Sequence, residues 1–289
     1  MLRWRLTLGT VFVAALVGLC WLDAGPRPGV WLMPLALLLA VAATQEMMWL
    51  FKGRGLSPTI WPAYAGNVCM VLAPAVSHWS GAREDVLAWP ACILALSAAL
   101  AFVVEMARYT EGGRTSESLA LAILVLVYVG LCLAFVVSLR LVAPDPGGIL
   151  ALASLVLVVK MCDTGAYTVG RLIGRRKLAP LLSPGKTIEG AVGGLVWGVA
   201  ASVAAFTFVV PALGPAAAPW WRWAAYGAAV ALSGTLGDLA ESLLKRDLGR
   251  KDSSPWMPGF GGVLDLLDSI LLAAPVAWLC WKTGLVWVR

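Results

Sequence analysis

The sequence has little charge, one histidine and no clustered cysteines. Charged residues make up 13% of its 289 positions, and His78 is the single histidine. Apolar residues make up 60%, and the mean hydropathy is +0.84; both lie far above the values of soluble globular domains. This composition excludes a soluble enzyme and predicts an all-α polytopic membrane protein without a separate soluble domain.

The six cysteines are scattered singly through apolar segments, and no two are spaced as Cys-x-x-Cys. This pattern indicates neither a zinc site nor a disulfide framework. A net charge of +6 would suggest nucleic acid as the partner of a soluble protein. Here almost all lysines and arginines lie in loops between apolar runs, where they determine orientation in the membrane, and no nucleic-acid partner is expected.

Apolar runs of about 18 to 25 residues, long enough to cross a bilayer, predict nine transmembrane helices. The runs lie at 6–22, 30–50, 59–76, 86–107, 118–139, 148–170, 188–210, 223–240 and 263–285. The first run is predicted to be a retained anchor rather than a cleaved signal peptide, because no small-residue cleavage site precedes Asp23.

Loops that are rich in lysine and arginine alternate along the chain with loops that are poor in them. One set carries fifteen of them and the other set carries six. The positive-inside rule then predicts an N-terminus in the cytoplasm and a C-terminus outside, in a membrane of the bacterial inner or cell membrane type. The loops 171–187 and 241–262 become cytoplasmic. Because the loop of His78 faces the other side, histidine catalysis on the cytoplasmic face is excluded.

Ionisable residues at membrane depth divide the chain in two. Residues 1–140 contain only Glu46 and Glu105 at that depth, whereas the last four spans hold or adjoin seven ionisable residues. Charges inside a bilayer are costly and usually mark a functional site. We therefore predict that 1–140 is a five-span scaffold facing lipid and that 141–289 is a four-span catalytic region.

The sixth span carries Lys160 and Asp163 on one helical face, in its cytoplasmic half. Such a pair either neutralises itself inside the membrane or belongs to a site. The run Asp163-Thr164-Gly165-Ala166-Tyr167 adds a hydroxyl and a glycine that permits close approach. This combination favours a site.

The seventh span begins near a Ser-Pro dipeptide. We expect Ser183 to cap this helix, with Pro184 in its first turn. Lys186 would then stand where the helix dipole disfavours a cation unless an anionic ligand is bound. The glycine five residues earlier that a P-loop requires is replaced by Pro180, so a P-loop is excluded.

Small residues every four positions predict close helix packing in the seventh span. They are Gly190, Gly194 and Gly198.

The eighth span ends with Asp238 and Glu241 on a face shared with Ser242 and Lys245. A Glu241–Lys245 pair explains Glu241, but Asp238 has no cation three or four residues later. Its carboxylate is therefore a better candidate for a ligand.

The ninth span opens with Asp265 and Asp268 after the turn that contains Gly261 and Gly262. If the eighth and ninth spans form an antiparallel hairpin, Asp238 and Asp265 would meet beside lysine and arginine. Carboxylates and cations in this arrangement suit magnesium and phosphate.

At these residues the chain resembles the phosphatidate cytidylyltransferases (CDP-diacylglycerol synthases). The family's signature runs Ser-x-apolar-Lys-Arg, four residues, Lys-Asp, and then Pro-x-His-Gly-Gly-apolar-x-Asp-Arg-apolar-Asp. It is matched at Ser242, Leu244, Lys245, Arg246, Lys251, Asp252, Pro258, Gly261, Gly262, Val263, Asp265, Leu267 and Asp268. Two further family segments are matched by Asp163–Tyr167 and Ser183–Gly190.

Three positions depart from the family's pattern. Phe260 stands where the family has His, Leu266 where it has Arg, and Met257 where Leu, Ile or Phe is usual. The first two departures remove polar groups from the matched segment.

The resemblance implies transfer of CMP from CTP to phosphatidate, which gives CDP-diacylglycerol and pyrophosphate for phospholipid biosynthesis. It implies magnesium held by Asp238 and Asp265, with Asp268 as a further catalytic carboxylate. Asp163 and Ser242 are candidates for orienting substrate or a second cation. The residues assigned to substrate binding are Lys186, Ser242, Lys245, Arg246, Lys251, Asp163, Gly261 and Gly262. The family also suggests a homodimer.

Three alternatives remain. A cation-coupled transporter would use Lys160, Asp163 and Asp238 along a conduction path, but it requires an inverted repeat and none is visible. A CDP-alcohol phosphatidyltransferase requires Asp-Gly-x-x-Ala-Arg, which is absent. The third is a weakened or divergent cytidylyltransferase with another lipid phosphate acceptor, suggested by Phe260 and Leu266.

Overall fold

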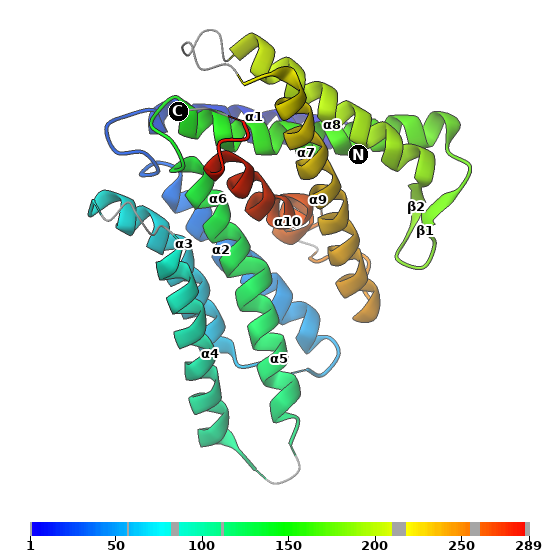
Figure 1. Cartoon of the computed structure of the whole chain (residues 1–289). Helices are drawn as coiled ribbons and strands as arrows, with labels where there is room; N and C mark the ends of the chain where they lie inside the picture. The colour runs from blue at the N-terminus through cyan, green and yellow to red at the C-terminus, as the bar shows by residue number, and fades with distance from the viewer. Residues whose placement is uncertain are drawn as a thin grey trace. The chain divides into compact units, whose positions relative to one another are not determined.

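The computed structural model describes residues 2–56, 58–81, 87–110, 113–209, 218–254 and 261–286, and helices dominate these ranges (Figure 1). The helices are α1 (Leu2–Asp23), α2 (Met33–Lys52), α3 (Ile60–Trp79), α4 (Ala88–Arg108), α5 (Thr115–Val125), the π-helical η1 (Leu126–Leu131), α6 (Cys132–Arg140), α7 (Gly147–Ile173), α8 (Ile188–Val209), α9 (Trp220–Asp247) and α10 (Val263–Lys282).

Each of the nine predicted apolar runs overlaps a helix, which confirms an all-α polytopic membrane protein. Within the described ranges, seven helical segments are long and apolar enough to span a bilayer. α5, η1 and α6 form one of these, Thr115–Arg140. The apolar stretch Gly9–Asp23 of α1 is shorter, and α9 is 28 residues long but carries several charges toward its end. The count of nine spans and the side of each terminus stay predictions.

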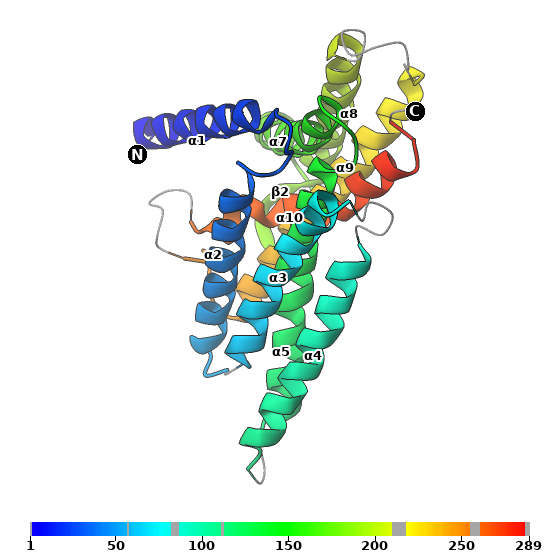
Figure 2. The same ribbon diagram turned by 90° about the vertical axis from the view of Figure 1, so that its left-hand side faces the viewer.

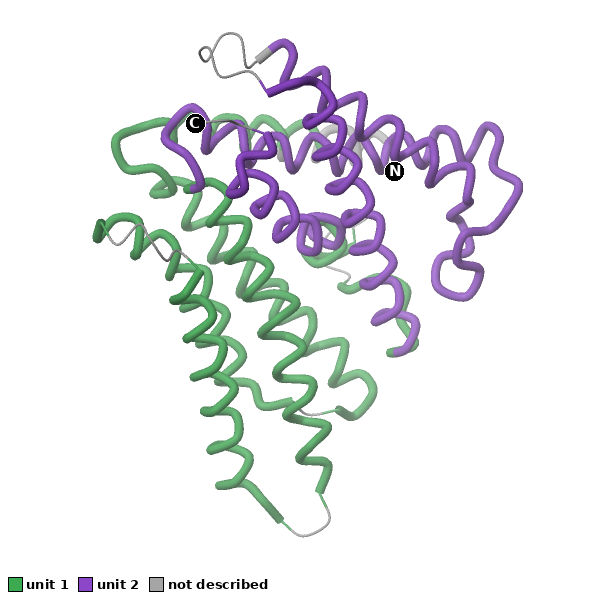
Figure 3. Tube along the Cα trace, viewed as in Figure 1, with its two compact units in different colours: residues 1–141, 248–266 green, residues 142–247, 267–289 purple. Residues whose placement is uncertain are grey.

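Two compact units divide the chain (Figure 3). Unit 1 contains residues 1–141 and 248–266, and unit 2 contains residues 142–247 and 267–289. Each unit is described by itself below.

In unit 1, α3 packs against α2, α4, η1 and α6, and α3, α4 and α5 lie side by side (Figure 2). Its core includes the fully buried side chains of Met47, Phe51 and Met70. A buried ion pair joins the ends of α1 and α6, with Arg140 Nε 2.8 Å from Asp23 Oδ2. The Asp23 carboxylate also accepts hydrogen bonds from backbone amides of the chain that follows α1.

In unit 2, glycines bring α8 against α7 and α9. A methyl group at Gly194 would lie 2.7 Å from the carbonyl oxygen of Cys162, and one at Gly198 would lie 2.9 Å from Ala231 Cβ. Contacts this close leave room only for hydrogen at these positions. The predicted packing role of the small-residue stripe is therefore confirmed.

Aromatic rings fill another part of the unit 2 core. The ring of Phe206 lies 5.9 Å from Trp223, 5.7 Å from Tyr226 and 6.0 Å from Trp281, between centroids. These distances are typical of aromatic pairs in protein cores. The cluster joins α8, α9 and the second half of α10.

A short β-hairpin between α7 and α8 was not predicted. Strand β1 (Lys177–Ala179) pairs in antiparallel fashion with β2 (Ser183–Thr187). The predicted helix cap at Ser183 is therefore wrong, since this residue opens a strand. The cap is instead Thr187, whose Oγ1 accepts a hydrogen bond from the Gly190 amide at 3.1 Å. Lys186 thus lies in β2 and not in a helical turn.

Candidate active site

Lys186 and Asp238 form the closest ion pair among the predicted site residues of unit 2. Lys186 Nζ lies 2.5 Å from Asp238 Oδ2, and the two side chains are 24% and 29% exposed. The ammonium nitrogen is buried and has no hydrogen-bond acceptor besides this ion pair within the described chain. An ammonium group has three N–H donors, so donors remain for an anionic ligand.

Two further carboxylates, from α7 and α10, act on this pair, and both also interact with Lys160. Lys160 and Asp163 pair at 3.5 Å on α7, and the charge on Asp163 interacts with Asp238 and Lys186. Asp268, on α10, interacts with Asp238 and Lys160. We call these five residues the carboxylate–lysine cluster.

The cluster has the donor types that magnesium prefers. Three carboxylates against two ammonium groups leave one excess negative charge, and oxygen ligands suit this cation. No three His, Cys, Asp or Glu side chains of the described ranges form a metal site by themselves. Magnesium is commonly held by one or two carboxylates together with substrate phosphates, so the residues present fit it.

The backbones of α9 and α10 pack closely at Asp268. A methyl group at Gly237 would collide with the Asp268 carbonyl oxygen and would lie 3.2 Å from Ser269 Cα. Gly237 directly precedes Asp238. The glycine therefore lets α9 and α10 approach at the level of their carboxylates.

Other predicted residues lie along the end of α9. Lys245 Nζ is 2.6 Å from Glu241 Oε2, which confirms the predicted pair. Arg246 Nε donates to the carbonyl oxygen of Leu182 in the hairpin at 3.1 Å. Ser242 Oγ lies 3.5 Å from Asp238 Oδ1, at the limit of a hydrogen bond.

Asp265 lies in unit 1, in the first turn of α10. Its Oδ2 accepts hydrogen bonds from the Gly262 amide at 2.8 Å, the Ser253 amide at 3.0 Å and Ser253 Oγ at 2.5 Å. Gly261 has a φ of +83°, and a methyl group there would lie 2.5 Å from Asp265 Oδ2. Glycine is needed at 261 for both reasons.

Glu46 of α2 is the site residue that sequence reasoning missed. The residue is only 6% exposed. Its carboxylate accepts hydrogen bonds from the amides of Val263 at 2.9 Å and Leu264 at 2.8 Å, and from Ser253 Oγ at 3.0 Å. The available signal was a carboxylate at membrane depth in an otherwise apolar half. Its partners lie more than two hundred positions away, beyond the reach of local patterns.

The segment before α10 also rests on the end of α2. The guanidinium of Arg250 lies 4.6 Å from the ring centroid of Trp49, within the range of a cation–π contact. Lys251, predicted to bind phosphate, is exposed.

Some predictions are not settled by this geometry. Asp238 and Asp265 belong to different units, so their expected meeting stays a prediction. Met257, Pro258 and Phe260 lie outside the described residues.

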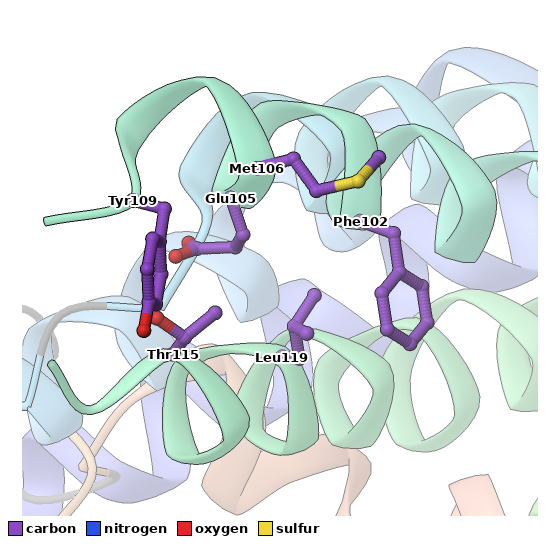
Figure 4. A pocket seen from close by; sticks show the side chains of 6 residues that line it. All are labelled: Phe102, Glu105, Met106, Tyr109, Thr115 and Leu119. Carbon is purple, nitrogen blue, oxygen red and sulfur yellow. The ribbon is translucent and has the colours of Figure 1, made fainter. Parts of the chain in front are cut away.

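A cavity of about 200 Å³ lies between α4 and α5 (Figure 4). It is lined by Phe102, Glu105, Met106, Tyr109, Thr115 and Leu119. Glu105 accepts hydrogen bonds from the hydroxyls of Thr59 and Ser118. No predicted site residue lines this cavity.

Fold and cluster together define an integral membrane protein with a cluster of lysines and carboxylates, contributed by three helices and a hairpin. Within this class, the chain belongs to the cytidylyltransferase family, whose sequence model matches residues 3–283. It is 31% identical over 281 residues to a phosphatidate cytidylyltransferase of Mycobacterium bovis, covering 95% of this chain and 85% of the relative. It is 30% identical over 246 residues to a phosphatidate cytidylyltransferase of Bacillus subtilis, covering 84% and 87%.

Proposed function

We propose that this protein transfers CMP from CTP to phosphatidate on the cytoplasmic face of the membrane, giving CDP-diacylglycerol and pyrophosphate. Family membership and the names of its relatives support this reaction. Within the structure, the observation that carries it is the buried ammonium of Lys186, which keeps unused donors beside the carboxylate of Asp238. A buried cation with spare donors is stabilised by an anionic ligand such as a phosphate.

The reaction requires positioning more than acid–base catalysis. A phosphate oxygen of phosphatidate attacks the α-phosphorus of CTP, a new O–P bond forms, and the bond to the β-phosphate breaks as pyrophosphate leaves. The second pKa of a phosphate monoester is about 6, so the nucleophile is largely ionised at neutral pH. The absence of a catalytic histidine is then no obstacle. Cations that neutralise the phosphates and hold them in line supply the catalysis.

Lysines and arginines would hold the phosphates in this proposal. Lys186 is the first of them because its ammonium is buried within the cluster, beside Asp238. Lys245, Arg246 and Lys251 are assigned to the triphosphate and the lipid phosphate by the family's signature. Lys245 is paired with Glu241, so its contribution depends on that carboxylate.

Carboxylates would hold magnesium. We assign Asp238 and, from the family's matched position, Asp265, with Asp268 as a further ligand and Asp163 beside a second cation or the substrate. Magnesium bound there would neutralise charge on the transferred phosphate. Lys160 and Lys186 limit the excess negative charge of the cluster when no cation is bound.

A lipid acceptor accounts for a charged site built on membrane-spanning helices. Phosphatidate would enter sideways from the inner leaflet, while CTP arrives from water. A homodimer, suggested by the family, is part of the same proposal.

The test is CTP-dependent formation of CDP-diacylglycerol by the purified protein in detergent with magnesium and phosphatidate. We expect Asp238→Asn to abolish product, because it removes the counter-charge of Lys186 and a metal ligand. Glu105→Gln is the control, since it also replaces a carboxylate by an amide, but outside the cluster, and should keep activity. Full activity of Asp238→Asn would contradict the assignment of Asp238 to the active site. If the wild type forms product only with a lipid phosphate other than phosphatidate, the proposed acceptor is wrong.

A further inference from the structure

The N-terminal amides of α10 are bound by carboxylates of the protein itself. A helix N-terminus after a glycine turn is a common anion site, and Gly261 and Gly262 suggest such a site here. The Gly262 amide donates to Asp265, and the amides of Val263 and Leu264 donate to Glu46. In this structure the amide donors are therefore occupied by the side chains of Asp265 and Glu46.

We propose that Glu46 is a positioning residue for Asp265, an inference that rests on the proposed function of Asp265 as a metal ligand. Glu46 acts through backbone amides and through Ser253, and it is not assigned any contact with substrate. Its role is to hold the first turn of α10 and the preceding segment in one arrangement, so that the Asp265 carboxylate keeps a single orientation.

The first argument is the hydrogen-bond pattern of Glu46. Both of its carboxylate oxygens accept a backbone amide, one from Val263 and one from Leu264. A carboxylate at a helix N-terminus also complements the helix dipole. A glutamine has the same shape but carries an NH₂ group in place of one oxygen, and this group would face a backbone donor.

The second argument is the hydroxyl shared by Glu46 and Asp265. Ser253 Oγ lies 3.0 Å from Glu46 Oε2 and 2.5 Å from Asp265 Oδ2. A hydroxyl has one proton and donates to one acceptor at a time. The Ser253 side chain therefore couples the two carboxylates, and a change at Glu46 alters the partner of Asp265.

The third argument is the space that Gly262 leaves. A methyl group at Gly262 would collide with Ser253 Oγ and with both carboxylate oxygens of Glu46. The second glycine of the turn thus makes room for Glu46. This accounts for a small residue at 262, where φ is not positive.

The fourth argument is that the docking is wider than one side chain. Arg250 stacks on Trp49, one turn of α2 beyond Glu46, and the side chain of Arg54 approaches Gly249, whose φ is +69°. The segment 248–266 therefore rests on the end of α2 through several contacts within unit 1. Among these contacts, the hydrogen bonds of Glu46 are those that reach the first turn of α10.

The experiment compares wild type, Glu46→Gln and Glu105→Gln in detergent. Hydrogen–deuterium exchange reports the amides of Val263 and Leu264, and electron paramagnetic resonance reports binding of Mn²⁺ as a substitute for magnesium. We expect Glu46→Gln to speed exchange at these amides roughly tenfold and to weaken Mn²⁺ binding about 10- to 100-fold. Glu105→Gln, the same change on α4, should leave both unchanged.

Unchanged exchange at Val263 and Leu264 would overturn the capping role. Faster exchange with unchanged Mn²⁺ binding would overturn the positioning role and leave a structural one. If Glu46→Gln does not fold, Ser253→Ala tests the coupling through Mn²⁺ binding alone, because it removes the shared hydroxyl and keeps the amide contacts of Glu46. Unchanged Mn²⁺ binding in Ser253→Ala would overturn the positioning role. Neither measurement depends on turnover. A wild-type protein that does not synthesise CDP-diacylglycerol would therefore contradict the proposed function, and this result is distinct from a failure of the positioning role.

Discussion

The ammonium nitrogen of Lys186, in strand β2, lies 2.5 Å from Oδ2 of Asp238, in helix α9. The hairpin therefore supplies the cation that the sequence around Asp238 lacks. It also places a basic residue where a phosphate and a metal-binding carboxylate are both expected.

Replacing Lys186 tests this relationship. Lys186→Met should lower kcat/KM for CTP by about 10- to 100-fold, because a hydrogen bond between charged groups is lost. The matched control is Lys177→Met in the same hairpin, whose exposed ammonium donates only to the Pro184 carbonyl oxygen among the described residues. Equal losses in both variants would mean that the hairpin, and not the ammonium of Lys186, matters.

Adding a methyl group at Gly237 should separate α9 from α10 at the cluster. Gly237→Ala would place Cβ against the Asp268 carbonyl oxygen, so we expect turnover to fall by about an order of magnitude or more. Gly18→Ala is the control, since that helical position has no neighbour within 4 Å. Steady-state kinetics of the two variants provide the measurement, and normal turnover of Gly237→Ala would argue against this spacing.

Gly262→Ala should inactivate the protein by a different route. The new methyl group would occupy the space of Ser253 Oγ and the Glu46 carboxylate, and a clash of this kind costs about 1 to 3 kcal/mol. Gly25→Ala, in a loop of the same unit with its nearest atom at 3.9 Å, should be neutral. Melting temperature and turnover measured together would reveal the change, and a fully active Gly262→Ala would refute the proposed contact.

The buried pair of Asp23 and Arg140 should dominate the ionic contribution to the stability of unit 1. Arg140→Met leaves a buried carboxylate without its cation, a change that costs about 3 to 5 kcal/mol. Arg114→Met breaks the exposed pair with Glu117, whose side chains are 73% and 44% exposed, and should cost about 1 kcal/mol or less. Thermal melting in detergent compares them, and similar shifts would be inconsistent with this reading.

The helices could be predicted because apolar length alone determines where a chain can cross a membrane. The hairpin could not. Its strands have three and five residues, too short for a periodic pattern, and Ser183-Pro184 is typical of a helix start. Pairing between β1 and β2 and the cap at Thr187 override that local preference.

Some residues of the proposed site could likewise be predicted from the sequence, and others could not. The missing local cation singled out Asp238 in the sequence, and its partner came from a segment that only the folded chain brings near. Lys186 was singled out by an expected place in a helix, which is wrong, although the residue remains in the proposed site. Glu46 was noticed as a charge at membrane depth but assigned to a scaffold, because no sequence pattern connects it to residues 262–264.

Glu46 binds backbone and not side chains of Val263 and Leu264. An amide is present whatever amino acid occupies the position, so substitutions at 263 and 264 leave the donors in place, with proline as the exception. Pairwise covariation between sequences would therefore record no partner for Glu46 at 263 or 264, and only the hydroxyl of Ser253 offers it a side-chain hydrogen-bond partner among the described residues. The part of the link between α2 and the start of α10 that the amides of Val263 and Leu264 carry is one that comparison of sequences alone does not detect.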